Sequence, residues 1–445
     1  MAPAPDPFDP LARPPALRVL SDGTIKQVNP FTGDLVWTVP GRADRPLSSP
    51  PATAHQLAPD ANATTCTFCT AMYLHTPPEK VRSVRKGTAY ERFTGLTPGE
   101  VNAQIADFRR IPNLFEIISV DYWRANYGFT MGPTARQRWE AYAASPGGRE
   151  HLLAMARARL GARAHTVDDD RLLQESRSFF VGTHDVIVGR RHYIDGARTD
   201  ADVASSGSLT PAEHREFIAL TADALGDLYA ANSDVRYVSA FQNWLHAAGA
   251  SFDHLHKQVV GIDEHGTRLQ FALRAAREHP DVWNQRILAP AIDHGLLVAE
   301  NDHAVAIAGV GHRYPSLEVW SLSATREPWL MAAEARDGVA DLVHALHVAT
   351  GADVPSNEEW HHTPPDVDVF MPWHVLLKWR VSTLAGFEGG TKIYTNTIGP
   401  WDVRRRVVEA LLQARAAGRV ADQLRIGTEM LTSVGALPSS ALARH

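Results

Sequence analysis

Two histidines and a glutamine alternate in the central segment Ser251-Phe-Asp-His254-Leu-His256-Lys-Gln258. If this segment is a β-strand, the three side chains share one face and lie about 6.6 Å apart. Burying three polar groups in a row costs free energy unless each group is hydrogen-bonded, so such a row is more readily explained by a binding or catalytic role. The preceding turn, AAGAS, would let backbone N–H groups approach an anion. The alternative is two ordinary histidines in the core or at the surface, but this context favours a site that binds an anion.

The chain has only two cysteines, Cys66 and Cys69. A Cys-x-x-Cys pair has the spacing of metal ligands, and zinc is the first candidate for two thiolates. The alternative is two unpaired thiols in the core. A pair this close cannot cross-link a chain of 445 residues. The cysteine usage therefore indicates a reducing compartment, and we expect a cytoplasmic protein.

The composition is that of a globular protein with more than one lobe. Of the 445 residues, 44% are hydrophobic, and 44 basic against 50 acidic residues give a net charge of −6. This composition excludes a disordered chain and a disulfide scaffold. Without a strong basic field, we expect neither nucleic acid nor a membrane surface as a partner. We find no apolar window long enough for a signal peptide or a spanning helix.

The chemistry-bearing residues need elements to position them, and the apolar pattern predicts these elements in two similar groups. In the first group, a capping box with proline at the first helical position starts a helix at Thr210. The predicted strands of this group are residues 184–189, 235–241 and 254–262, after a short strand that ends at 39. The second group has predicted strands at 296–300, 304–308, 317–322 and 369–381, and helices at 330–350 and 402–417.

Each group has strands, a long helix and a further strand that carries histidine, which is a weak hint of a duplicated α+β unit. We divide the chain into an irregular arm at 1–28, an N-terminal half at 29–265, a connecting helical segment at 266–290, a C-terminal half at 291–432 and a loose tail at 433–445.

The segment FQNWLHAAGASFDHLHKQ resembles the active-site strand of the galactose-1-phosphate uridylyltransferase family, within the histidine-triad-like superfamily. Five further blocks resemble that family in the same order along residues 29–396. They are NPFTGDLVWTVPGRADRP, CTFCTAMYLHTPPE, RRIPNLFEII, HDVIVGRRHY and TLAGFEGGTKIYTN. One block would be weak support, whereas six in order cover most of the chain.

The resemblance implies an α+β fold of two histidine-triad-like halves, each a curved, mostly antiparallel sheet with packed helices. The active site would lie at the edge of the first half, with the C-terminal half closing over the sugar. The resemblance is also compatible with a homodimer.

The resemblance also supplies two further metal ligands, His192 and His254, beside Cys66 and Cys69. Four protein ligands close a tetrahedron, so this Zn²⁺ would be structural and would not activate water. His184 is the alternative ligand if the register is shifted.

In the catalytic site that the resemblance implies, His256 is the nucleophile, and the amide of Gln258 hydrogen-bonds the phosphoryl group. Glutamine cannot deliver a proton to a poor leaving group, so this position favours transfer over hydrolysis. The other implied contacts are the phosphate-binding Arg42, Arg45 and Ser251, the nucleotide-binding Asn113 and Asn243, and the sugar-binding Glu388. The alternatives for these residues are solvated surface charges, turn residues and an exposed loop glutamate.

The implied activity is ping-pong transfer of a nucleoside monophosphate, first of all UMP, from a nucleotide sugar to a sugar 1-phosphate. The alternatives are an adenylyl-transferring phosphorylase that uses inorganic phosphate, and a zinc-stabilised nucleotide-binding protein without turnover. Leu245 and His246 stand where the family pattern has glycine and alanine, so the base and the sugar stay open. We expect no second catalytic or metal centre around the lone His374, and we expect His361 and His362 to be surface or packing residues.

Overall fold

The computed structural model describes residues 16–41, 54–382 and 384–439. Its main feature is one twelve-stranded sheet, in the order β16-β10-β11-β12-β14-β13-β8-β9-β7-β6-β4-β5, in which all neighbouring strands pair antiparallel. The N-terminal half contributes β4 (Val81–Lys86), β5 (Ala89–Phe93), β6 (Phe108–Pro112), β7 (His184–Gly189), β8 (Tyr237–Trp244) and β9 (His256–Ile262). The C-terminal half contributes β10 (Leu297–Glu300), β11 (Ala304–Ala308), β12 (Ser316–Ser321), β13 (Ser356–His361), β14 (His374–Trp379) and β16 (Arg425–Ile426).

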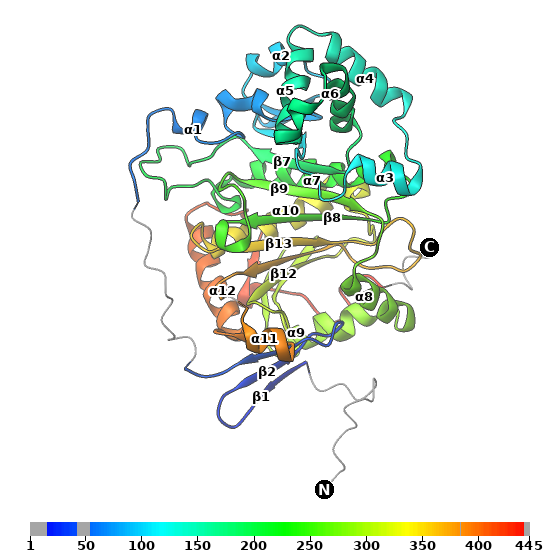
Figure 1. Ribbon diagram of the computed structural model, residues 1–445. Coiled ribbons are helices and arrows are strands. Elements are labelled where there is room, and N and C mark those ends of the chain that lie inside the picture. The colour runs from blue at the N-terminus through cyan, green and yellow to red at the C-terminus, as the bar shows by residue number, and fades with distance from the viewer. Residues whose placement is uncertain (1–15, 42–53, 383, 440–445) are drawn as a thin grey trace.

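The sheet has an approximate two-fold symmetry about the joint between β8 and β13. Outward from this joint the strands run β9, β7, β6 on one side and β14, β12, β11 on the other. Each half also has a long helix between equivalent strands, α7 (Pro211–Ala231) in the first and α10 (Ala333–Thr350) in the second. These two helices pack against each other on one face of the sheet, which leaves the opposite face open around the joint (Figure 1). The predicted α+β class is therefore confirmed, although the two half-sheets are fused into one.

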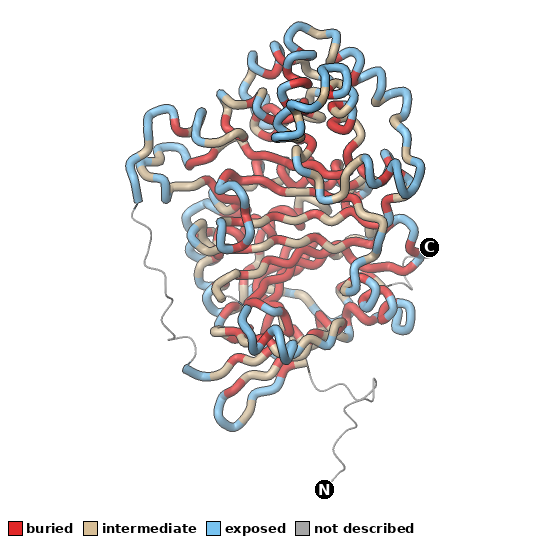
Figure 2. Tube along the Cα trace, viewed as in Figure 1, coloured by how far each residue is buried: buried red, intermediate tan, exposed pale blue. Residues whose placement is uncertain are grey.

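The start of α7 follows from its sequence. The Thr210 hydroxyl accepts a hydrogen bond from the Glu213 N–H, and the Glu213 carboxylate accepts one from the Thr210 N–H. Pro211 fills the first helical position, where no N–H is needed. The apolar face of the helix, with Phe217 and Leu225 fully buried, packs on the sheet. Figure 2 shows that the central strands are the most deeply buried part of the molecule.

The predicted irregular arm at 1–28 is wrong for the residues that the structure describes. Three short strands, β1 (Leu17–Val19), β2 (Ile25–Val28) and β3 (Leu35–Thr38), form a second sheet with β15 (Ile393–Asn396). β15 pairs parallel with β3, so this sheet joins segments some 350 residues apart in sequence. The predicted loose tail is also wrong at Leu437, which is buried and exchanges two hydrogen bonds with the side chain of Asn284.

A helical insertion between β6 and β7 forms a lobe of its own at the top of Figure 1. It contains α4 (Pro133–Ala144), α5 (Gly148–Leu160) and α6 (Asp169–Glu175) around a small core that includes Trp139 and Leu152. α3 (Val120–Tyr127) belongs to the same insertion, but its Trp123 packs in the main core. The other helices are α1 (Ala61–Thr64), α2 (Pro98–Ala103), α8 (Thr267–Glu278), α9 (Ala289–Asp293), α11 (Gly386–Thr391) and α12 (Pro400–Ala416). Across the described residues, no helix combines the length and apolar character needed to cross a membrane.

Candidate active site and metal centre

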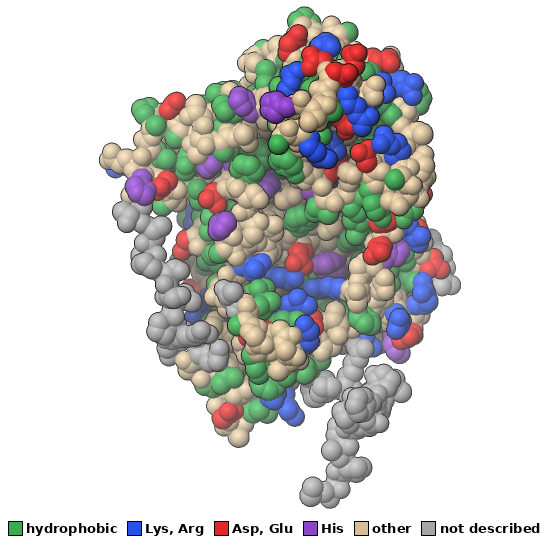
Figure 3. Space-filling view, viewed as in Figure 1, with side chains coloured by type: hydrophobic (Ala, Val, Ile, Leu, Met, Phe, Trp, Pro, Cys, Tyr) green, Lys and Arg blue, Asp and Glu red, His purple; other side chains and the backbone are tan. Residues whose placement is uncertain are grey.

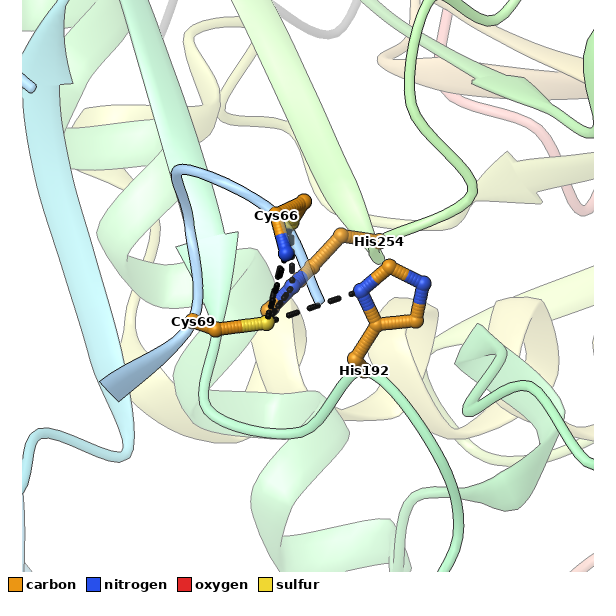
Figure 4. A group of neighbouring side chains, drawn as sticks. All are labelled: Cys66, Cys69, His192 and His254. Atoms are coloured by element: carbon orange, nitrogen blue, oxygen red, sulfur yellow. Dashed lines mark hydrogen bonds between the residues drawn. The ribbon is translucent and has the colours of Figure 1, made fainter. Parts of the chain in front are cut away.

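The four predicted metal ligands meet at one end of the twelve-stranded sheet (Figure 4). Cys66 and Cys69 come from the loop after α1, His192 from the loop after β7, and His254 from the loop before β9. One ligand atom from each of the four residues lies within 4.8 Å of the others. Three loops that are distant in sequence are therefore drawn together at this point.

The spacing of these atoms fits a tetrahedral ion. A zinc ion with ordinary bond lengths would hold two sulfurs about 3.8 Å apart, and a sulfur and a nitrogen about 3.6 Å apart. The two Sγ atoms of Cys66 and Cys69 are 3.7 Å apart. Cys66 Sγ lies 3.4 Å from His254 Nδ1, and Cys69 Sγ lies 3.6 Å from His192 Nδ1. The cluster can therefore hold a metal without rearrangement.

The protonation of the ligands also suits a metal. His254 Nε2–H donates to the Gly189 carbonyl at 2.6 Å, so its Nδ1 keeps a lone pair directed at the two sulfurs. The hydrogen bond between the two thiols lowers the pKa of Cys69 and raises that of Cys66. A thiolate and an imidazole lone pair are the donors that zinc prefers.

His256 is the first residue of β9, and its side chain is 5% exposed. Its Nδ1–H donates to the His254 carbonyl at 2.7 Å, which leaves the lone pair on Nε2. Burial lowers the pKa of His256 to about 4, although the hydrogen bond to His254 has the opposite effect. The ring is therefore a neutral imidazole with a fixed tautomer. β9 lies between β8 and β7, one strand from the joint with the C-terminal half, and His256 stands at its N-terminal end.

Phe68, for which the sequence analysis predicts no role, contacts His256. Its ring centroid lies 5.5 Å from that of His256 and 4.8 Å from that of Phe252. Phe68 stands between the two cysteines, so the loop that carries both thiols also packs against His256. A Cys-x-x-Cys search finds the cysteines but assigns no role to the residues between them.

Gln258 contacts a residue that we had considered only as an alternative metal ligand. His184 Nδ1 accepts a hydrogen bond from the Ile117 N–H at 3.2 Å, so the neutral ring carries its proton on Nε2. That Nε2 lies 2.9 Å from Gln258 Oε1 and donates to it. The Gln258 amide nitrogen is therefore left free to donate elsewhere. Asn113 lies beside the pair, with its Nδ2 3.0 Å from His184 Nε2, whereas His184 is not in the metal cluster.

The loop between β8 and β9 is held by residues of both halves. Asn357 on β13 donates from Nδ2 to Asn243 Oδ1 at 2.7 Å and to the Ala248 carbonyl at 2.9 Å. Arg380 in turn donates to Asn357 Oδ1 at 2.7 Å. Ser251 is exposed at the end of this loop, shortly before His254 and His256. The C-terminal half thus positions part of the expected phosphate-binding loop.

Two groups of predicted residues do not join this site. Arg42 and Arg45 lie outside the described residues. Glu388 is buried in α11, where its carboxylate accepts hydrogen bonds from the Ala385 N–H and the Thr395 hydroxyl. In Figure 1, α11 lies beside the four-stranded sheet, and β8, β13, β14 and β12 separate it from β9. Within a single chain, Glu388 therefore does not lie near His256.

Comparison with known families agrees with this geometry. The model of the family described as Domain of unknown function (DUF4921) matches residues 20–438. The chain belongs to the DUF4921 family. This DUF4921 protein is also 23% identical to the ADP-glucose phosphorylase of Arabidopsis thaliana over 192 residues, which are 41% of the chain and 54% of the plant enzyme. The aligned part thus spans only about half the length of that relative.

Two solved structures from the same plant share the fold of this DUF4921 protein. One is an ADP-glucose phosphorylase with bound ADP-glucose, with a TM-score of 0.56, 17% identity, and coverage of 86% of this chain and 97% of the other. The other is a GalT-like protein, with a TM-score of 0.55, 16% identity, and the same two coverages. The predicted likeness to GalT-like proteins is therefore confirmed, at low identity.

Proposed function

We propose that this protein is a nucleotidylyltransferase that moves a nucleoside monophosphate from a nucleotide sugar through a covalent intermediate on His256. The observation that carries the proposal is the fixed tautomer of His256, whose Nδ1–H is bound to a carbonyl while Nε2 keeps its lone pair. The adjacent Gln258 amide on the same strand face supports it.

The proposed reaction has two half-steps at one phosphorus. His256 Nε2 attacks the α-phosphorus, an N–P bond forms, and the bond from phosphorus to the bridging oxygen breaks, which releases a sugar 1-phosphate. The His256 Nδ1–H stays on the ring and donates to the His254 carbonyl throughout. A phosphate oxygen of the acceptor then attacks the same phosphorus, and the N–P bond breaks to restore the neutral imidazole.

Gln258 and His184 act together in this proposal. The proton on His184 Nε2 holds the Oε1 atom of Gln258, so the Gln258 amide N–H groups face the place where the phosphoryl oxygens develop charge. A phosphate leaving group needs no proton, which agrees with glutamine rather than an acid at this position. His184 is a positioning residue, since it acts on the phosphoryl group only through Gln258.

We propose Zn²⁺ as the ion of the Cys66, Cys69, His192 and His254 cluster. The two-sulfur, two-nitrogen donor set and its tetrahedral spacing support zinc. With four protein ligands the ion would be structural. Its effect on the reaction would come from holding Phe68 and the His254 carbonyl, both of which contact His256.

No contact of the described residues identifies the base of the nucleotide sugar or the acceptor of the nucleoside monophosphate. UMP transfer between sugar 1-phosphates is one candidate. The partial match to an ADP-glucose phosphorylase supports the other, AMP transfer to inorganic phosphate. Both use the same half-reaction at His256, and they differ in donor and acceptor.

The decisive experiment separates the two half-reactions. The protein is incubated with ADP-, UDP- or GDP-glucose labelled in the α-phosphate, without an acceptor, and then quenched. We expect one acid-labile adduct per chain, absent in His256→Gly and unchanged in the control His279→Gly, an exposed histidine at the end of α8. Release of the label by inorganic phosphate or by a sugar 1-phosphate then identifies the acceptor. Tight nucleotide-sugar binding without any adduct would instead show a binding protein and refute the mechanism.

A further inference from the structure

The two-fold symmetry of the sheet places a second histidine at the position of His256. β14 is the equivalent of β9, and His374 is its first residue, as His256 is the first residue of β9. His374 pairs across the ladder with Trp320, as His256 pairs with Val188. The His374 Nδ1–H donates to the Pro372 carbonyl at 3.0 Å, again two residues earlier, which leaves the lone pair on Nε2.

An aromatic pocket surrounds this second histidine. The His374 ring is stacked between Trp320, at 3.9 Å between centroids, and His361, at 4.9 Å. The pocket is lined on its other sides by side chains of α8 and of the segments before and after it, which include Arg268, Phe31 and Trp283. Stacked rings on both sides fix the direction of the His374 ring.

The pocket also contains the guanidinium group of Arg268, which makes no direct ion pair among the described residues. Arg268, half-buried on α8, has no carboxylate within ion-pair distance among the described residues. The carboxylate of Glu318 faces the same pocket, but its two oxygens accept hydrogen bonds from His312 Nε2 at 2.7 Å and from Trp320 Nε1 at 2.9 Å. Burial would raise the pKa of Glu318, but His312 and Arg268 lower it overall, so the charges of Arg268 and Glu318 lie near each other, although no hydrogen bond joins them among the described residues. The Arg268 N–H groups can therefore still donate to an added anion.

The neighbouring positive charges strengthen this preference. Burial is the largest cause of the lowered pKa of Lys378, and the charges of Arg268 and Arg313 lower it further. The two guanidinium groups therefore lie near the Lys378 ammonium group. Lys378 is paired with Glu359 at 2.7 Å, whereas Arg313 and Arg380 have no ion-pair partner in the part of the chain that the structure describes. Figure 3 shows basic side chains gathered in a hollow of the open face. In a protein with a net charge of −6, such a local surplus of positive charge indicates an anionic ligand.

We propose that this pocket, defined by Arg268, Trp320, His361 and His374, binds the phosphate group of a small phosphorylated compound. Arg268 is expected to contact the phosphate oxygens, and the Nε2 lone pair of His374 to accept a hydrogen bond from a hydroxyl of the ligand. The source is inorganic phosphate itself or the phosphate of a sugar phosphate or a nucleotide.

This second site binds without reacting. Leu376 stands where the first half has Gln258, since both residues lie on the row of paired residues through Phe241 and Glu359. No amide is therefore presented to a phosphoryl group beside His374. From strand spacing and rise, His374 lies about 19 Å from His256, whereas reacting atoms must approach to about 3.5 Å. The bound phosphate is thus a separate ligand, and the inference does not depend on the reaction proposed at His256.

Titration calorimetry of the full chain tests the site directly. Inorganic phosphate, a hexose 1-phosphate and AMP are titrated separately into the wild type and Arg268→Gln. Arg274→Gln removes an exposed arginine of the same helix and serves as the matched control. We expect Arg268→Gln to weaken phosphate binding at least about tenfold, and Arg274→Gln to leave it unchanged. Arg268→Lys should keep most of the affinity, which guards against a folding defect.

Two further readings separate this site from the one at His256. Phosphate binding that depends on Arg268 should persist in Gln258→Leu, and labelling of His256 should be normal in Arg268→Gln. Tighter Arg268-dependent binding of the hexose phosphate or of AMP than of free phosphate would identify the rest of the ligand. No phosphate binding by the wild type, equal affinity in both arginine variants, or loss only in Gln258→Leu would overturn the proposal.

Discussion

Leu245 adopts a backbone conformation that side chains avoid. Its φ is 65° and its ψ is 155°, immediately after β8 and before the loop that leads to His256. Such a conformation costs about 1–3 kcal/mol for a residue other than glycine. The glycine that the resembling family has at this position is therefore explained by the backbone, and the leucine here is under strain.

A pair of substitutions measures that strain. Leu245→Gly and Leu245→Ala lose the same packing against the core, but only glycine accepts the positive φ without penalty. We expect the glycine variant to be more stable than the alanine variant by about 1 kcal/mol, measured as the free energy of unfolding in urea. An alanine variant as stable as the glycine variant would contradict the strain.

His184 offers a second test at the scale of single residues. His184→Phe removes the proton donated to Gln258 Oε1, so the Gln258 amide is free to rotate. We expect labelling of His256 by a nucleotide sugar to slow by about 10- to 100-fold, while the metal content stays unchanged. His184→Asn, which restores a donor, should recover part of the rate. Loss of metal in His184→Phe would instead favour His184 as a ligand.

At the scale of elements, the metal cluster fastens three loops at one end of the sheet. The loop with Cys66 and Cys69 also carries Phe68, which contacts His256. The site is therefore built from the ends of elements, and an ion bound by the cluster would keep those ends ordered. A metal in this cluster would therefore affect the structure of the site and would not take part in the reaction at phosphorus.

Removal of the metal tests this arrangement. The purified protein should contain about one equivalent of zinc, and a chelator or Cys66→Ser should remove it. We expect a lower melting temperature and slower labelling of His256, with recovery when zinc is added back to the chelated wild type. Phe68→Ala should keep the zinc but also slow labelling. A metal-free protein with full stability would disprove the four-ligand centre.

The elements show why the sequence predicted some features and not others. The helix after Thr210 is coded by residues within one turn, so it was predicted with its correct start. β1 and β2 were missed because they are only three and four residues long, and because their sheet is completed by residues 393–396. The strand with His256 begins two residues later than expected, and His254 precedes it, so the two histidines do not share a ladder.

In the candidate site, too, some residues could be predicted from the sequence and others could not. Ligand and nucleophile positions could be predicted, because sequence spacing and family resemblance mark them. The contacts of Phe68, His184 and Asn357 could not, because each depends on side chains more than 70 residues away. The pocket at His374 could not be predicted, because its lining residues are scattered along the sequence and form no recognisable motif.

At the scale of the molecule, a buried ion pair ties the two halves together. Lys257 on β9 points away from His256, toward α7, into the interior of the molecule. Its ammonium group lies 2.5 Å from Glu358 on β13, and the other oxygen of Glu358 lies 2.7 Å from His347 Nε2 on α10. Burial alone would raise the pKa of Glu358, but Lys257 and His347 lower it overall.

Breaking this pair should destabilise the whole molecule. Lys257→Met leaves the Glu358 carboxylate buried without its cation, at a cost of about 3–5 kcal/mol in the free energy of unfolding. The double variant Lys257→Met, Glu358→Leu should recover most of that loss. A single variant as stable as the wild type would show that the pair contributes nothing.

The same ion pair makes the stability of the folded protein depend on pH in the acid range. Because the pKa of Glu358 is lower in the folded protein than in the unfolded chain, its contribution to stability is complete above the unfolded pKa of about 4.3 and declines below it. We expect the wild type to lose stability more steeply than the double variant as the pH falls below about 4.5, as measured by urea unfolding at several pH values. Parallel curves would contradict this assignment.

The joint between β8 and β13 has a consequence for synthesis on the ribosome. All residues of the metal cluster and of β9 have been made by residue 262, whereas β13 begins at residue 356. During that interval the nascent N-terminal half exposes the bare edge of β8, which in the finished protein is covered by β13. Exposed sheet edges promote aggregation, so the N-terminal half is most open to aggregation during this interval.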